Sequence, residues 1–233
     1  MAIEFGLLTL GAYLLGSVPA AYLAARWSRG IDIRQCGDGN VGSTNLMRLT
    51  SKRVAIPVVI FDLGKGALMV WIAQLLGLDI TQQAVVGVAA VIGHNWPVFL
   101  RFNGGRGILT TLGIIFILVP WLGLIALIIA YGMAPFRQLA LGTMIAVASL
   151  PIFSWFLPQP FGIEKPLPIT LGFVAIFLLA VIRRLTAPRT LFTASVTSGQ
   201  LFVNRLLFDR DIRDRKAWIN RRLPEQQGKQ GKG

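Results

Sequence analysis

The chain has 233 residues, of which 54% are hydrophobic and 14% are charged, and its mean hydropathy is +0.64. Ordinary soluble domains carry about 25% charged residues, so this composition, with its single cysteine, excludes a soluble globular enzyme, a disordered chain and a disulfide-stapled secreted module. The formal net charge is +13, and its position between and after the apolar runs predicts anionic lipid and anionic substrates as partners, with no nucleic acid.

Several apolar runs reach the length that crosses a membrane, which predicts an all-α fold, a polytopic membrane helical bundle. Pro120 divides one long run, and we expect two short helices there, each of about 12 residues or roughly 18 Å. Helices that short persist in a membrane only when they pack against protein or line a wet cavity. If the run 108–134 is divided in this way, the bundle has about seven membrane crossings. The alternative is that this run forms one kinked span. The predicted runs are 3–25, 54–78, 84–100, 108–134, 139–157 and 167–185.

Basic residues flank these runs unevenly, with six in the loop 26–53 and ten in the tail 186–233. Because basic loops stay on the cytoplasmic side, we expect the N-terminus outside, the C-terminus in the cytoplasm and an odd number of crossings. Two units follow: a membrane-embedded domain over residues 1–185 and a basic cytoplasmic tail over residues 186–233. Within the tail, 201–223 is typical of an amphipathic helix on the inner membrane surface, and 225–233 is predicted to be disordered.

The loop after the first run is dense in groups that bind a phosphate. Gly37, Gly39 and Gly42 lie within six residues, and glycine allows a loop to aim successive backbone N–H groups at one point. Arginine gives bidentate contacts to phosphate, and a helix that begins after the loop would add its N-terminus. An ordinary polar loop with capping residues is the alternative. The polar and charged candidates are Arg34, Asp38, Asn40, Ser43, Thr44, Asn45 and Arg48.

A second glycine-rich turn, 93–107, leads into another apolar run. Gly104, Gly105 and Gly107 bracket Arg106, so the turn has the composition of a second phosphate site, although it lacks the Gly-Lys-Ser/Thr spacing of a Walker loop. His94 is the only histidine of the chain. It is either a general base or a buried imidazole that is hydrogen-bonded to the backbone.

Two ionisable residues interrupt the run 54–78. Asp62 and Lys65 are three positions apart and share one helix face, so they are placed to pair. Charged groups inside a membrane are costly, and such a pair is either structural or part of a site. No spacing of histidine, cysteine or carboxylate residues indicates a metal site, and no motif indicates a cofactor.

Together these motifs resemble those of one family, the bacterial integral-membrane acyl-phosphate:glycerol-3-phosphate acyltransferases. The family's first motif is matched at Asp32, Ile33, Arg34, Gly37, Gly39, Asn40, Gly42, Thr44, Asn45 and Arg48. Its second motif is matched at Gly93, His94, Pro97, Val98, Phe102, Gly104, Gly105 and Gly107. An Asp-x-x-Lys-Gly element between the two is matched at Asp62, Lys65 and Gly66. The resemblance covers roughly the first 140 residues of the chain.

The resemblance implies transfer of a fatty acyl group from an acyl-phosphate to the 1-hydroxyl of glycerol 3-phosphate, in the inner membrane of a bacterial cell and without a cofactor. The products are lysophosphatidic acid and phosphate. The proton acceptor stays open between Asp38, His94 and a substrate phosphate oxygen. Lys65 and His94 are expected to orient or polarise the substrates. One phosphate is expected at Asn40, Ser43, Thr44, Asn45 and Arg48, and the other at Gly104, Gly105, Arg106 and Gly107.

The chain departs from the family pattern at three places. Asp38 stands where the family has serine, and Arg106 stands where it has lysine. After the last span, family members usually carry a third motif that resembles His-Arg-x-Asn-Ile-x-Arg-Leu. Its histidine is absent from this tail, where Asn204 to Leu207 match the motif only in part. These departures keep two alternatives open: a relative that is substrate-shifted or non-catalytic, and a transporter of a phosphorylated metabolite. The sequence indicates no oligomeric state.

Overall fold

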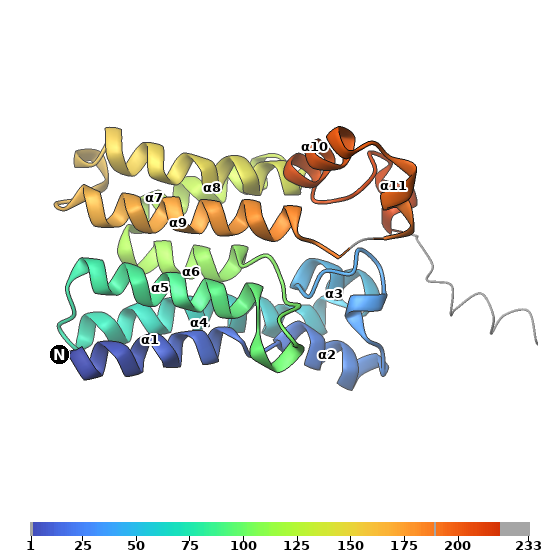
Figure 1. Cartoon of the computed structure of the whole chain (residues 1–233). Helices are drawn as coiled ribbons and strands as arrows, with labels where there is room; N and C mark the ends of the chain where they lie inside the picture. Colours follow the sequence, from blue (N-terminus) through green and yellow to red (C-terminus); the bar gives the residue numbers. More distant parts are fainter. Residues whose placement is uncertain (1, 189, 220–233) are drawn as a thin grey trace, which may run out of the picture.

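The computed structural model describes residues 2–188 and 190–219, and the described part of the chain is helical, with no strand. Seven helices lie side by side as a bundle, and four shorter ones gather at the end of it that lies opposite the N-terminus (Figure 1). The bundle consists of α1 (Ala2–Gly16), α4 (Lys52–Leu75), α5 (Ile80–Asn95), α6 (Ile108–Leu118), α7 (Pro120–Gly132), α8 (Leu139–Phe156) and α9 (Pro166–Leu185). The shorter helices are α2 (Ala20–Arg29), α3 (Ser43–Leu49), α10 (Ser198–Phe208) and α11 (Arg215–Ile219).

Five stretches of the described chain are long and apolar enough to cross a membrane, and α6 and α7 are two shorter apolar helices. The predicted all-helical membrane bundle is therefore confirmed, and five long spans plus two short ones give the expected seven. The predicted split also holds, because Val119 leaves helical geometry and Pro120 opens α7. At 1.5 Å per residue the two short helices are only about 17 and 20 Å long. They pack against α4 and α8, and this packing with protein replaces the missing length.

The first predicted run is one stretch in the sequence but two helices in the structure. α1 ends at Gly16 and α2 begins at Ala20, with the turn Ser17 to Pro19 between them. Proline has no N–H to continue the hydrogen-bond ladder, so the helix breaks at this point. Close packing explains the position of the break, because a Cβ on Gly16 would meet the carbonyl oxygen of Ala90 in α5. The break brings the backbone of this turn into the interior of the bundle.

The tail differs from its prediction. Instead of a single helix over 201–223, the described chain forms α10 and α11, separated by the turn 209–214, and residues 220–223 lie outside the described residues. Asp209, the first residue of this turn, has a left-handed backbone with φ +53°. α10 packs against α8 and α9, and Asn204 and Arg205 are buried. Specific buried polar contacts therefore turn the chain back onto the bundle. The predicted disordered end, 225–233, lies outside the described residues.

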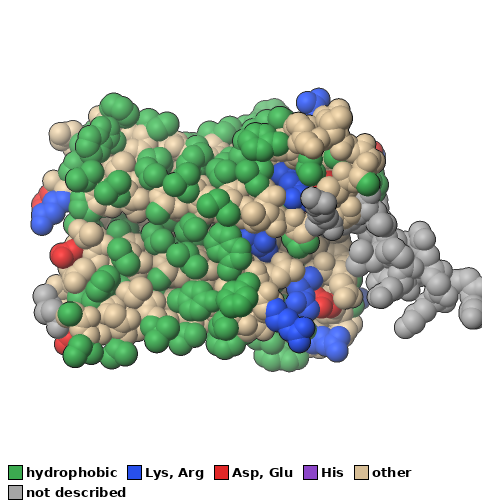
Figure 2. Space-filling model, in the orientation of Figure 1, with side chains coloured by type: hydrophobic (Ala, Val, Ile, Leu, Met, Phe, Trp, Pro, Cys, Tyr) green, Lys and Arg blue, Asp and Glu red, His purple; other side chains and the backbone are tan. Residues whose placement is uncertain are grey.

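Side chains sort by type along the bundle. Hydrophobic side chains cover its flank, whereas arginine and lysine side chains gather at the end formed by α2, α3 and the tail helices (Figure 2). Large exposed apolar residues of the bundle helices include Leu7, Ile60, Trp71 and Ile128. An apolar flank next to a basic end is the surface expected of a bundle that lies in lipid with one end in water.

Candidate active site

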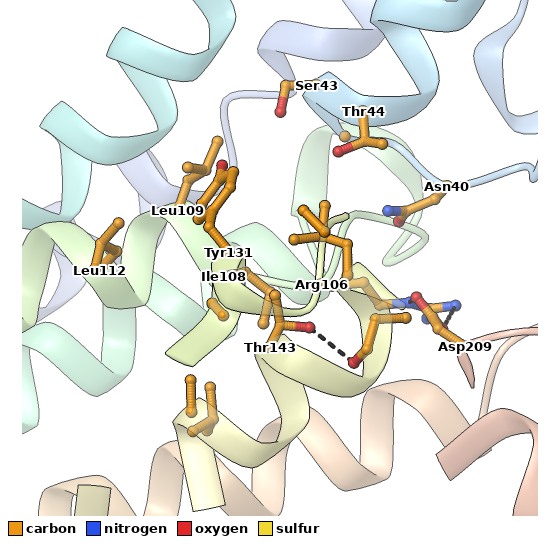
Figure 3. A pocket seen from close by; sticks show the side chains of 18 of the residues that line it. Asn40, Ser43, Thr44, Arg106, Ile108, Leu109, Leu112, Tyr131, Thr143 and Asp209 are labelled. Carbon is orange, nitrogen blue, oxygen red and sulfur yellow. Dashed lines mark hydrogen bonds and ion pairs between the residues drawn. The ribbon is translucent and has the colours of Figure 1, made fainter. Parts of the chain in front are cut away.

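A cavity of about 390 Å³ opens at the basic end of the bundle and continues between α6, α7 and α8. Its open end is polar and its inner end is apolar (Figure 3). Both glycine-rich loops and the tail contribute to the open end, so segments far apart in the sequence meet there. The polar lining includes Asp38, Asn40, Ser43, Thr44, Arg48, Asp62, His94, Arg106, Thr143, Arg184, Asp209, Arg210 and Arg215. The apolar lining includes Leu112, Ile115, Ala126, Ala130, Ala146, Val147 and Leu150.

The first glycine-rich loop is folded around one buried amide. Asn45 Nδ2 donates to the carbonyl oxygens of Cys36 at 3.0 Å and Asn40 at 3.2 Å, and its Oδ1 accepts from Asp38 N–H at 3.2 Å. Gly37 has φ +60°, and a Cβ there would collide with Asn45 Oδ1. Asn45 is fully buried and does not line the cavity, so it shapes the loop and is not placed to contact a phosphate.

Asp38 holds the polar edge of this loop in place. Its Oδ2 accepts from Arg48 Nη1 at 2.9 Å, and its Oδ1 accepts from the Asn40 N–H at 3.0 Å. Asp38 therefore fixes the two neighbours that face the cavity. The negative charge that the sequence places in this loop is paired with an arginine, and that arginine keeps further N–H groups for another anion.

In the second loop, the backbone N–H groups of two glycines predicted to bind a phosphate donate to carbonyls that close the loop. Gly105 N–H donates to the His94 carbonyl at 3.1 Å, and Gly104 N–H donates to the Asn95 carbonyl at 3.2 Å. A Cβ at either glycine would collide with the His94 residue, so only glycine fits so close to the end of α5. Both N–H groups are therefore engaged within the loop in this structure, and the contact of Gly104 and Gly105 with a phosphate stays a prediction. Arg106 and Gly107 do line the cavity.

Arg183, at the end of α9, clamps the same loop from the other side. Its Nε donates to the Gly105 carbonyl at 3.1 Å, and its Nη2 donates to the Gly104 carbonyl at 2.7 Å and to Asn103 Oδ1 at 3.0 Å. Only 4% of Arg183 is exposed. An arginine that looks in sequence like a cytoplasmic anchor of the last span is thus a buried structural group of the loop.

Arg106 extends from this loop to the tail. Its Nη1 donates to the Arg183 carbonyl at 2.7 Å, and its Nε donates to Asp209 Oδ2 at 2.9 Å. Nη2 of Arg106 lies 2.7 Å from Asp209 Oδ1. Figure 3 shows Arg106 and Asp209 facing each other beside Asn40. The ion pair lines both the main cavity and an adjoining cavity of about 410 Å³, so it stands between the two.

The predicted pair of Asp62 and Lys65 forms, with Nζ 2.8 Å from Oδ1, and both side chains are buried. Lys65 Nζ also donates to the Gly16 carbonyl at 3.0 Å and lies 2.8 Å from His94 Nδ1. An ammonium group has donors only, so His94 Nδ1 is the acceptor. With a charged Lys65 as the donor to Nδ1, the imidazole proton lies on Nε2. Lys65 itself does not line the cavity, whereas Asp62 and His94 do.

More cations surround the cavity mouth than the two loops supply. Arg184 is 3% exposed and donates to the carbonyls of Leu206 at 2.6 Å and Ala140 at 2.7 Å. Partial burial, and then the nearby positive charges of Arg48 and Arg137, lower the pKa of Arg215. Like charges that crowd around one opening favour an anionic ligand there.

Sequence reasoning missed Arg183, Arg184, Asp209 and Arg210 as residues of the site. Arg183 and Arg184 lie at the end of the last span, where basic residues commonly anchor a helix at the membrane surface. Asp209 and Arg210 lie in a stretch that the sequence pattern assigned to a surface helix. No local signal separates such residues from ordinary basic and acidic ones. Only the return of the tail onto the bundle places them at the cavity.

Fold and cavity together define an integral membrane protein with a cation-rich cavity opening at the end of its bundle and an apolar arm of that cavity between its helices. Among the described residues, no three His, Cys, Asp or Glu side chains gather closely enough to hold a metal ion.

Comparison with known proteins gives the family. A family model described as glycerol-3-phosphate acyltransferase matches residues 6–194. Glycerol-3-phosphate acyltransferase 5 of Dehalococcoides mccartyi is 47% identical over 221 residues, which cover 95% of each chain. A glycerol-3-phosphate acyltransferase of Synechococcus sp. is 43% identical over 152 residues, covering 63% of this chain and 73% of that one.

A solved structure agrees with this result. The crystal structure of PlsY, an integral membrane glycerol 3-phosphate acyltransferase in its glycerol 3-phosphate form, superposes with a TM-score of 0.68 at 30% identity. The match covers 78% of this chain and 88% of that chain. The chain therefore belongs to the glycerol-3-phosphate acyltransferase family, as its motifs predicted, and it is a membrane-embedded acyltransferase.

The buried charge cluster gives a first prediction. Lys65→Met leaves Asp62 as an uncompensated buried carboxylate, so we expect a loss of about 3–5 kcal/mol in the free energy of unfolding. Thermal unfolding in detergent micelles measures the loss. The double variant Asp62→Asn/Lys65→Met is the matched control and should recover part of it. Unfolding of Lys65→Met at the wild-type temperature would contradict the structural role of the pair.

Proposed function

We propose that this acyltransferase takes its acyl group from an acyl-phosphate and transfers it to the 1-hydroxyl of glycerol 3-phosphate. The single observation that carries the proposal is the shape of the main cavity, in which a cation-rich opening continues into an apolar arm between α6, α7 and α8. An acyl-phosphate has the same two parts, an anionic head and an apolar chain. The glycerol 3-phosphate and lysophosphatidic acid forms of the PlsY crystal structure support the acceptor and the product.

In the proposed reaction, the 1-hydroxyl oxygen attacks the acyl carbonyl carbon and forms the new ester bond. The bond from that carbon to the phosphate oxygen breaks, and phosphate leaves with the electron pair. The acyl-phosphate is already activated, so no covalent enzyme intermediate is required. The work of the protein is then to position two anions and to stabilise the charge that develops between them.

Arg48 and Arg106 are the charged groups that we assign to the phosphates, with hydroxyl and amide donors from Asn40, Ser43 and Thr44 beside them. All five line the main cavity. Asp38 fixes Arg48 and the Asn40 backbone, which supports a positioning role for this aspartate. Arginine and hydroxyl donors placed around one opening form the kind of fixed, positive environment that a phosphoryl group requires.

The hydrogen bonds reduce the choice of proton acceptor. His94 presents Nε2–H, a donor, because Lys65 occupies Nδ1. Both oxygens of Asp38 already accept hydrogen bonds within the loop, from Arg48 and from the Asn40 N–H. We therefore propose that the hydroxyl proton passes to a phosphate oxygen of the substrates, and that His94 acts as a donor that orients the reacting groups.

The reaction is tested on detergent-purified protein given labelled glycerol 3-phosphate and one of three donors: acyl-phosphate, acyl-CoA or acyl carrier protein. We expect lysophosphatidic acid from acyl-phosphate alone, because only that donor brings a second phosphate directly next to the acyl carbon. Arg48→Ala and Arg106→Ala should each lower kcat/KM by about 100-fold, as expected for the loss of a charged transition-state contact.

Four results would contradict the proposal. Product from acyl-CoA and none from acyl-phosphate would reject the donor, and wild-type rates in both arginine variants would reject the assigned site. A pH profile in which kcat falls at low pH, with a midpoint near the ordinary histidine pKa, would indicate His94 as the base. Absence of product with every donor would favour the substrate-shifted or non-catalytic alternative.

The apolar arm is the proposed seat of the acyl chain. Ala126, Ala130 and Ala146 line it from α7 and α8, and Leu150 is buried at its inner end. Ala146→Phe should fill part of this space and lower kcat/KM for palmitoyl phosphate about tenfold more than for octanoyl phosphate. Ile145→Phe is the matched control, because Ile145 is exposed on the outer face of α8. Equal effects on both donors would place the chain elsewhere.

We also propose that the chain lies in the inner membrane of a bacterial cell, with residues 1–185 embedded and the tail in the cytoplasm. The basic end of the bundle and the odd number of spans support this orientation. A reporter fused to the C-terminus should be active only in the cytoplasm, and a reporter before α1 only outside. A periplasmic signal from the C-terminal fusion would reject the orientation.

A further inference from the structure

The tail is part of the cavity wall. Phe208, Asp209 and Arg210 from the end of α10, and Trp218 from α11, line the same cavity as the two glycine-rich loops. These residues lie after the 6–194 segment that the family model matches. The relative of Dehalococcoides mccartyi aligns over 95% of the chain and therefore shares most of this segment.

Buried polar contacts fix the tail to the end of α9. Arg205 Nε donates to Asp211 Oδ1 at 2.8 Å, and Nη1 of Arg205 donates to the carbonyls of Leu185 and Ala187, each at 2.8 Å. Hydroxyl groups of Thr190 and Thr193 donate to Asp211 Oδ2 at 2.6 and 2.8 Å. Burial alone raises the pKa of Asp211, but the hydrogen bonds from Arg205 and the two threonines hold it below its usual value. The turn that follows α10 is thus held in one place.

Asp209 lies at this fixed turn in an unusual backbone conformation. It ends α10 with φ +53°, in the left-handed region, where aspartate and asparagine are tolerated better than most side chains. Its carboxylate faces the Nε and Nη2 edge of Arg106, while Nη1 of Arg106 donates to the Arg183 carbonyl. Only 16% of the Arg106 side chain and 19% of the Asp209 side chain are exposed.

These contacts leave donors on Arg106 for a ligand. A guanidinium group has five N–H donors in a fixed plane. Within the described chain, Nε donates to Asp209 and Nη1 donates to the Arg183 carbonyl, while Nη2 lies at ion-pair distance from Asp209 Oδ1. The N–H groups of Nη1 and Nη2 that these contacts do not engage face the cavity as donors for an anion, and the plane in which they lie is set by Asp209.

Neighbouring cations offset the negative charge of Asp209. Arg210 follows it directly and lies over the Phe208 ring at 5.0 Å, and its buried Nε has no hydrogen-bond partner among the described residues. Arg184 and Arg215 line the same cavity. The opening therefore stays positive although Asp209 neutralises one of its arginines, which is the balance that phosphate binding needs.

We propose that Asp209 is a positioning residue of the acyltransferase: its carboxylate holds the Arg106 guanidinium in the plane in which the two terminal nitrogens receive a substrate phosphate. The inference rests on the proposed role of Arg106. It means that the tail, which lies beyond the family segment, completes the substrate site and orders an otherwise long and flexible arginine side chain before substrate binds.

Asp209→Asn and Asp209→Gly test the proposal. Both residues accept a left-handed backbone, so both variants are expected to fold, and thermal unfolding in detergent checks this directly. We expect kcat/KM with acyl-phosphate and glycerol 3-phosphate to fall about tenfold in each variant, the size of one lost charge-assisted contact. Asp214→Asn is the matched control in the same segment, because asparagine also caps α11, and it should retain the wild-type rate.

A double-mutant cycle with Arg106→Lys shows whether Asp209 acts through Arg106. In the Arg106→Lys background, Asp209→Asn should change kcat/KM by less than about twofold, because the group that it orients is gone. An equal loss in both backgrounds would overturn the proposal, as would a wild-type rate in folded Asp209→Asn. A faster Asp209→Asn enzyme would show that the carboxylate competes with substrate. If Arg106→Lys and Arg106→Ala keep the wild-type rate, the site assignment fails instead.

Discussion

Lys65 carries a positive charge into the interior of an apolar bundle, and acceptors from three helices receive it. The carbonyl of Gly16 belongs to α1, Asp62 to α4 and His94 to α5. A charge in that environment is tolerated only when its partners are in place, so this contact fixes the relative depth of three helices. It also fixes the tautomer of His94 and the end of α5, from which the second glycine-rich loop departs. The loop then closes on the His94 carbonyl, so the geometry of the site depends on one buried ammonium group.

The two arginines assigned to substrate phosphates are each held by an aspartate. Asp38 holds Arg48 from within the first loop, and Asp209 faces Arg106 from the tail. An unpaired arginine loses much side-chain freedom when it binds an anion, whereas a paired one has lost it already. Two of the three departures from the family pattern, Asp38 and Arg106, therefore have a common physical explanation, because each supplies one member of these two pairs.

The cavity connects a cation-rich opening with an apolar arm, and the proposed acyl-phosphate likewise connects an anionic head with an apolar chain. Its opening lies at the basic end of the bundle, and its apolar arm runs between the short helices α6 and α7 and the long helix α8. Short helices that do not fill the height of the bundle, and small residues on α7 and α8, leave the space for the arm. A membrane enzyme that acts on a charged head and a long chain needs this continuity, since both parts must be held while the bond between them changes.

Much of the fold is determined by short stretches of sequence. Apolar runs define the helices, Pro120 divides one of them, and the spacing of Asp62 and Lys65 places the two on one helix face. The glycines mark both loops that shape the site. The structure adds how each loop is held together, because Asn45 lies buried under the first loop and the N–H groups of Gly104 and Gly105 close the second.

Only the tertiary structure decided which distant groups meet. Arg183 binds a loop 78 residues earlier in the chain, and Arg106 meets Asp209 across 103 residues. Hydropathy, proline and glycine act over one or two helical turns, so they can be read from local sequence. The meeting of a tail carboxylate and a loop arginine depends on how helices pack and on how buried polar groups turn the chain, and no local pattern records either.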